Sequence, residues 1–204
     1  MATAPRHRFY WLPNALTISR IFSIPLIIWG ILSIANDWGG FLAKAWVLGG
    51  LFGLACLTDF LDGYFARRWN LVSGFGRMID PIADKLLVAG CLIAFSIISN
   101  GQWFILTPAL LIIGRDILVS GVREHAALSS KVMPPTSLAK WKTACEMLAI
   151  AALLLWIIFK AYLPLGEAVS SWALGAMNAG VLLLWLAAIL SVYTGSLYLR
   201  AAIK

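Results

Sequence analysis

The chain has 204 residues, of which 61% are hydrophobic and only 12% are charged, and its formal net charge is +7. Soluble domains carry about 25% charged residues, so this composition excludes an ordinary soluble domain and predicts a protein embedded in a membrane. The positive charge suits contact with anionic headgroups and anionic substrates. Membrane lipids, and not nucleic acid, are therefore the expected partners.

The hydrophobic stretches predict an all-α fold, a polytopic membrane protein with six transmembrane helices. Each stretch is close to or above the roughly 20 residues needed to cross a bilayer. In chain order they are Leu16–Ala35, Ala43–Phe65, Pro81–Ser99, Phe104–Ala126, Thr143–Leu163 and Ala173–Leu199. Short connectors such as Asn100–Trp103 indicate antiparallel neighbours. We expect one helical domain over residues 14–204.

Residues 1–13 are expected to form a short N-terminal interfacial segment. Arg6–Pro13 is basic and aromatic, which is typical of a segment lying along the membrane surface. It lacks the cleavage site and short apolar core of a secretory signal.

The basic residues predict the orientation of the helices. Six spans place both termini on one side, and every Lys and Arg except Lys44 and Lys160 lies on that side or leans towards it. By the positive-inside rule, this side is cytoplasmic.

Four of the chain's 9 acidic residues, Asp59, Asp62, Asp80 and Asp84, lie in one short stretch at this side. A carboxylate at the centre of a membrane helix costs roughly 2.5–3.5 kcal/mol on insertion scales, so a cluster of four requires a cation among them. The spacings of three and four residues place each pair on one face of a helix. All-oxygen ligands favour Mg²⁺, Mn²⁺ or Ca²⁺ over zinc, and four carboxylates can hold two such ions.

Small residues and one arginine accompany these acids. Gly63, Ala66 and Gly76 either allow close helix packing or leave room for a ligand beside the metals. Arg67 either sets the topology or pairs with a phosphate. Asp80, followed by Pro81, could also be the N-cap of a helix.

Together these residues match the pattern D-x-x-D-G-x-x-A-R-x8-G-x3-D-x3-D at every position from Asp59 to Asp84. The pattern resembles that of the CDP-alcohol phosphatidyltransferases, which have six spans and about this length. The resemblance implies a homodimer whose site, at the cytoplasmic surface, joins the phosphatidyl group of a CDP-linked lipid to an alcohol and releases CMP.

The resemblance also implies roles for the motif residues. The four aspartates would ligate two divalent cations, Mg²⁺ or Mn²⁺, with Asp59 and Asp80 bridging them. Asp84 would also take the proton from the acceptor hydroxyl. The pocket for CDP-diacylglycerol would be shaped by Gly63, Ala66, Arg67 and Gly76.

Three further segments bear on the acceptor alcohol. Pro13–Ile21, Gly114–His125 and Ala139–Glu146 are similar to the phosphatidylglycerophosphate synthase branch of the family, which implies glycerol 3-phosphate as acceptor. A dianionic acceptor needs cationic partners. The candidates near the ends of the fourth and fifth spans are Arg115, Arg123, Lys140 and Lys142.

Two alternatives remain open from the sequence. A sister transferase could use another acceptor, such as inositol phosphate, serine or a second lipid. A divalent-cation transporter is the remote alternative, although its acids would form a path across the membrane, whereas these gather at one face. If the chain is a transferase that uses glycerol 3-phosphate, we expect an integral protein of the bacterial inner membrane.

Overall fold

The computed structural model describes residues 12–36, 41–68, 74–128, 137–162 and 171–203, and this part of the chain forms six helices and no strand. The helices are α1 (Leu12–Asn36), α2 (Phe41–Arg68), α3 (Gly74–Ile98), α4 (Trp103–Leu128), α5 (Ser137–Ala161) and α6 (Ser171–Ile203). The expected interfacial segment, 1–13, lies outside the described residues except for Leu12 and Pro13, which begin α1.

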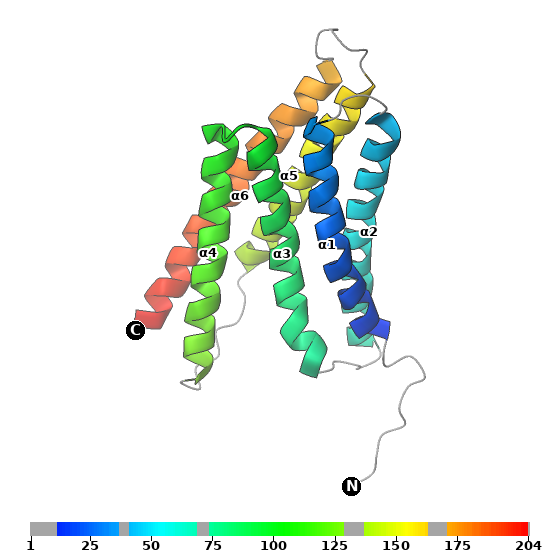
Figure 1. The fold of residues 1–204 in the computed structure, drawn as a ribbon. Coiled ribbons are helices and arrows are strands. Elements are labelled where there is room, and N and C mark those ends of the chain that lie inside the picture. Colours follow the sequence, from blue (N-terminus) through cyan, green and yellow to red (C-terminus); the bar gives the residue numbers. More distant parts are fainter. Residues whose placement is uncertain (1–11, 37–40, 69–73, 129–136, 163–170, 204) are drawn as a thin grey trace.

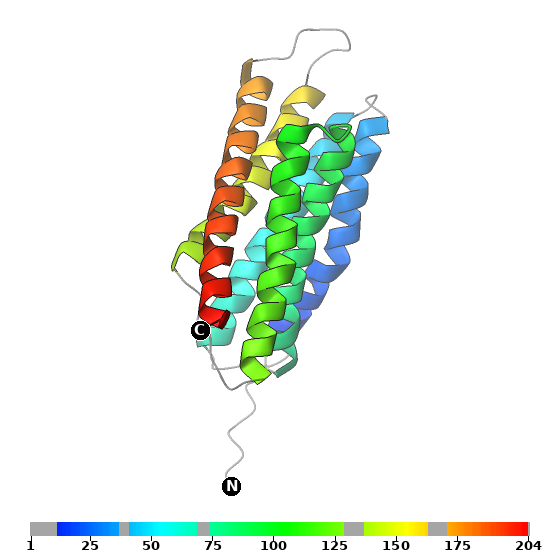
Figure 2. The same cartoon turned by 90° about the vertical axis from the view of Figure 1, so that its left-hand side faces the viewer.

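The helices run alternately up and down, so that α1, α3 and α5 begin at the end where α2, α4 and α6 finish (Figure 1). The view turned by 90° shows the same bundle with α4 and α6 in front (Figure 2). Helix α1 packs on α2 and α3, and α4 packs on α3 and α6. Helix α5 packs on α6 and also contacts α2 and α3, which joins the two halves of the bundle.

All six helices are long and apolar enough to cross a membrane, which confirms the expected all-α, six-span architecture. The chain is therefore an integral membrane protein. The helices extend beyond the predicted spans at the end where α3 and α5 begin. Helix α3 already starts at Gly74, so Asp80 lies inside the helix, and the alternative that it is an N-cap is wrong.

The connection between α3 and α4 is as short as the sequence predicts. Asn100 and Gly101 adopt positive φ angles of 53° and 68°, a conformation that glycine and asparagine reach at low cost. The Gly101 amide donates to the Ser96 carbonyl at 2.9 Å and thereby closes the last turn of α3. The two helices are consequently antiparallel neighbours.

An apolar core fills the middle of the bundle, and glycines bring its helices close together. Fully buried side chains such as Ile27, Phe95 and Leu153 contribute to this core. A Cβ at Gly90 would meet Ile28 Cδ1 at 2.5 Å, and one at Gly180 would meet Leu153 Cγ at 2.9 Å. Small residues thus set the spacing between α1 and α3 and between α5 and α6.

Gly180→Ala should destabilise the bundle, because its new methyl group would lie 2.9 Å from Leu153 Cγ and 3.2 Å from the Leu153 backbone nitrogen. Overpacking of this kind costs about 1–3 kcal/mol, and thermal unfolding in detergent measures it. Gly175→Ala in the same helix is the matched control, since its Cβ would meet nothing within 4 Å. Equal melting temperatures for the two variants would contradict the packing argument.

Candidate functional site

The acidic motif converges on one face of α1. Thr17 and Arg20 are three residues apart and therefore share a face of this helix. Thr17 Oγ1 donates to Asp80 Oδ1 at 2.7 Å. Arg20 Nη1 lies 2.7 Å from Asp59 Oδ1 and 2.8 Å from Asp84 Oδ1. Side chains from α1, α2 and α3 thus meet at the end of the bundle where α3 begins.

Arg20 forms ion pairs with two carboxylates of this site, those of Asp59 and Asp84. Its side chain is 0% exposed, whereas the side chains of Asp59 and Asp84 are 42% and 40% exposed. A buried guanidinium is costly unless carboxylates pair with it, and here two do so. Because the carboxylates are partly exposed, they can also accept ligands from the solvent side. We call Asp59, Asp80 and Asp84 the acidic cluster.

The structure brings together three of the four predicted metal ligands. The side chains of Asp62, Ala66 and Arg67 lie outside what the structure describes, as do the surroundings of Gly76, although the backbone of these residues belongs to α2 and α3. Gly63 lies half-buried in α2. The predicted roles of these residues therefore stay predictions.

The donors fit a hard divalent cation by their chemistry. The oxygens of Asp59 and Asp84 lie within two hydrogen-bond lengths of each other, because both contact the same nitrogen of Arg20. Carboxylate oxygens are the ligands that Mg²⁺ and Mn²⁺ prefer. Among the side chains that are described, however, no three acidic, His or Cys groups are arranged closely enough to hold a metal.

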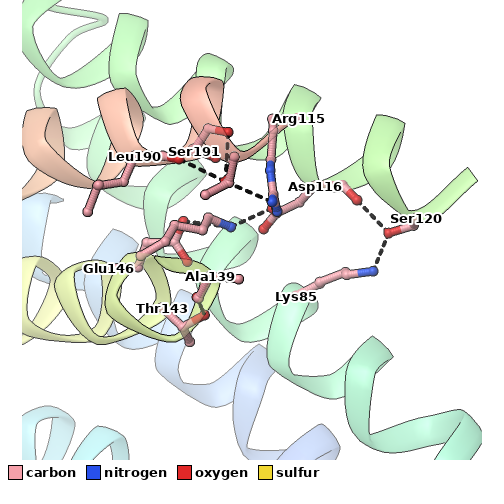
Figure 3. A network of polar contacts seen from close by, with 11 residues as sticks. Lys85, Arg115, Asp116, Ser120, Ala139, Thr143, Glu146, Leu190 and Ser191 are labelled. Atoms are coloured by element: carbon pink, nitrogen blue, oxygen red, sulfur yellow. Dashed lines mark hydrogen bonds and ion pairs between the residues drawn. The ribbon is translucent and has the colours of Figure 1, made fainter. Parts of the chain in front are cut away.

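A second polar cluster lies between α4, α5 and α6 (Figure 3). Asp116 Oδ1 accepts from Arg115 Nη1 at 2.8 Å and from Lys142 Nζ at 2.5 Å. Lys142 Nζ also lies 2.9 Å from Glu146 Oε1, and both of these side chains are buried. We call Arg115, Asp116, Lys142 and Glu146 the four-charge network; its two positive and two negative groups balance.

Helix α6 fixes the position of Arg115. The guanidinium donates from Nη2 to Thr194 Oγ1 at 2.9 Å and lies 5.9 Å from the centre of the Tyr198 ring. A Cβ at Gly195 would meet Arg115 Cγ at 2.9 Å, so glycine leaves the space that the arginine stem occupies. The hydrogen bond and the ring contact hold the charge in one place.

The four predicted phosphate-binding cations fall into two groups. Arg115 and Lys142 come together, but each is paired with acids of the four-charge network. Arg123 and Lys140 lie exposed on α4 and α5. Arg115 and Lys142 therefore share a partner in Asp116, whereas Arg123 and Lys140 lie at the surface.

Sequence reasoning missed the roles of Thr17 and Arg20. From the sequence, Arg20 is one of the basic residues that predict the orientation and a member of the Pro13–Ile21 segment, and neither observation predicts a contact with the acidic motif. A charge inside an apolar span is itself a sign of a functional or buried partner, and this could have singled out Arg20. Nothing in the sequence alone could have shown which carboxylates it meets.

Comparisons with known proteins agree with the motif. The family model described as CDP-alcohol phosphatidyltransferase matches residues 10–193. A CDP-diacylglycerol–glycerol-3-phosphate 3-phosphatidyltransferase of Rickettsia felis is 41% identical over 95% of this chain and 96% of its own length. The protein of that name from Rickettsia bellii is 43% identical, with the same coverage. A cardiolipin synthase (CMP-forming) of Oryza sativa subsp. japonica is 35% identical over 96% of this chain but 58% of its own length.

Arg20→Gln should lower the stability of the protein in detergent, because Asp59 and Asp84 would lose their common partner. The expected cost is about 1–3 kcal/mol, since charge-assisted contacts are worth about that much and the exposed parts of the carboxylates are screened by water. Ser19→Ala is the control, because this neighbouring hydroxyl is exposed and, within the described residues, bonds only to the Leu16 carbonyl of its own helix.

A double-mutant cycle tests whether the contact itself is responsible. Asp84→Asn should cost less in the Arg20→Gln protein than in the wild type, with a coupling of at least about 0.5 kcal/mol. Additive losses would mean that Arg20 stabilises the bundle by some means other than its pairing with Asp84.

Proposed function

We propose that this chain, which belongs to the CDP-alcohol phosphatidyltransferase family, transfers the phosphatidyl group of CDP-diacylglycerol to glycerol 3-phosphate and releases CMP. It is an enzyme of phospholipid biosynthesis. The observation that carries the proposal is the meeting of Asp59, Asp80 and Asp84 at one face of α1. The names of the two Rickettsia relatives support the choice of acceptor.

The acidic cluster, together with Asp62, is proposed to bind two divalent cations, Mg²⁺ or Mn²⁺. When bound, the cations supply the positive charge that orients the pyrophosphate and stabilises the leaving CMP. Thr17 and Arg20 hold the carboxylates from the α1 side. Asp84 then accepts the proton of the acceptor hydroxyl, which attacks the phosphorus directly, without a covalent enzyme intermediate. In the same proposal, Gly63, Ala66, Arg67 and Gly76 form the pocket for the CDP group.

The acceptor phosphate is proposed to bind at the side of α3 away from α1. Arg115 and Lys142 supply charge from fixed positions there, and the exposed Arg123 and Lys140 add charge at its rim. Because Asp116 and Glu146 balance the first two cations, the exposed residues contribute more of the net positive field that attracts a dianion.

The surroundings of the enzyme are also a proposal. We place it in the bacterial inner membrane as a homodimer, with the acidic cluster and both termini on the cytoplasmic side. The bacterial relatives support the inner membrane, the homodimer follows from the resemblance to the family, and the charge distribution along the helices supports the orientation. Lys44 at the start of α2 and Lys160 near the end of α5 lie at the opposite end of the bundle from Arg20 and Arg200 (Figure 1), as the positive-inside rule requires.

The acceptor assay tests the proposal directly. Purified protein with CDP-diacylglycerol should release CMP when glycerol 3-phosphate is added, but not with inositol phosphate, serine or phosphatidylglycerol. Phosphatidylglycerol is included as the second-lipid acceptor because a cardiolipin synthase is among the relatives. Preference for any other alcohol would replace the proposed acceptor, and no CMP release with any of them would favour a transporter.

Removal of the metal should abolish transfer, because the carboxylates alone cannot neutralise the developing phosphoryl charge. We expect EDTA to lower the rate by orders of magnitude and added Mg²⁺ or Mn²⁺ to restore it. We expect Mn²⁺ to raise the melting temperature of the wild type, and Asp80→Asn should lower the rate similarly and remove this increase. Full activity in EDTA, or in the Asp80→Asn protein, would overturn the metal mechanism.

A further inference from the structure

Lys85 follows Asp84 on α3 but its side chain lies on the other side of the helix. Consecutive residues of a helix are about 100° apart around its axis, so Asp84 contacts Arg20 of α1 while Lys85 reaches α4. Lys85 Nζ donates to Ser120 Oγ, and Ser120 Oγ donates to the Asp116 carbonyl at 2.5 Å (Figure 3). Lys85 thus connects the edge of the acidic cluster to the four-charge network.

Lys85 forms no ion pair with an acid in the described part of the chain, and the nearby carboxylate of Asp116 is already bonded to Arg115 and Lys142. The one hydrogen-bond partner of Lys85 there is a neutral hydroxyl, and its side chain is exposed. Among the charges that act on Lys85, the opposite charge of Asp116 has the largest effect, followed by the like charges of Arg123, Lys142 and Arg115. In contrast, Arg115 and Lys142 are paired with carboxylates. Because Arg115 and Lys142 already bond to Asp116, Lys85 and Arg123 add positive charge to this region without a carboxylate bonded to them in the described part of the chain.

Like charges that gather around a partly open site repel one another unless an anion joins them. A phosphate monoester dianion is the chemical class that this region fits, because its oxygens accept several charge-assisted hydrogen bonds at once. The position next to Asp84 adds a geometric constraint. The side chains of the consecutive residues Asp84 and Lys85 diverge by about 100° around the axis of α3, so an alcohol that contacts both must lie across the edge of the helix between them.

We infer that Lys85 binds the phosphate of the acceptor and selects phosphorylated alcohols, while Ser120 is a positioning residue that holds the ammonium group in place. The inference rests on the proposed function and deepens it. The hydroxyl of the acceptor lies towards Asp84, and its phosphate lies towards Lys85. A small alcohol without a phosphate gains nothing from this residue.

The test compares glycerol 3-phosphate with glycerol in Lys85→Gln. The KM for glycerol 3-phosphate should rise about 10- to 100-fold, since a charge-assisted contact is lost. We expect the wild type to use glycerol slowly; that rate and the KM for CDP-diacylglycerol should stay within about twofold in the variant, so the preference for the phosphorylated alcohol falls by the same factor as the KM for glycerol 3-phosphate rises. Lys85→Arg, which keeps the charge, should recover most of that preference.

Two further variants distinguish binding from structural damage. Ser120→Ala should also raise the KM for glycerol 3-phosphate, but by a smaller factor than Lys85→Gln does. Lys44→Gln removes an equal charge near the start of α2, at the other end of the bundle from Lys85. It should change none of the kinetic constants. An unchanged KM in Lys85→Gln, or equal losses with glycerol and glycerol 3-phosphate, would overturn the inference. Wild-type protein that ignores glycerol 3-phosphate would overturn the proposed acceptor, and this inference with it.

Discussion

The buried guanidinium of Arg20 is the contact on which the arrangement of the first three helices depends. A charged group without exposure to solvent is costly in any protein, and more so in a membrane. Its cost is offset here because α2 and α3 each bring a carboxylate to the same nitrogen. The hydrogen bond from Thr17 to Asp80, one turn away, adds a second point of contact on the same face. The rotation of α1 relative to its two neighbours is thereby fixed.

The other half of the bundle uses the same principle with different partners. Helices α4, α5 and α6 bury the four-charge network, in which Asp116 and Glu146 offset the charges of Arg115 and Lys142. Gly195 allows the arginine stem to lie against α6. Beyond the two polar clusters, apolar side chains fill the bundle. Contacts between apolar side chains do not depend on direction as hydrogen bonds and ion pairs do. The charged contacts therefore specify which helix faces meet, and the apolar core and the glycines set how closely they pack.

Helix α3 carries two members of the acidic cluster, and its Lys85 contacts Ser120 beside the four-charge network. Asp80 and Asp84 face α1, and Lys85 faces α4. In the proposed reaction, the CDP-linked lipid and the phosphorylated alcohol occupy the two sides of this helix, and Asp84 lies at the boundary between them. Two anionic substrates can then bind near each other, because a separate set of cations neutralises each one. The division follows from the helical periodicity, which turns neighbouring residues to different faces.

The sequence by itself determined the six spans, the short turn at Asn100–Trp103 and the presence of a carboxylate motif, because hydrophobic length, turn residues and fixed spacing are local properties. It also placed Asp59, Asp80 and Asp84 at the same end of the bundle. Only the tertiary structure decided that Asp80 lies inside α3, that Arg20 joins two of the carboxylates and that acids neutralise Arg115 and Lys142. A membrane helix that is apolar on all sides does not reveal which face meets a neighbour, since lipid and protein core are equally apolar surroundings. The partners of its few polar residues are therefore fixed by packing, which no local pattern encodes.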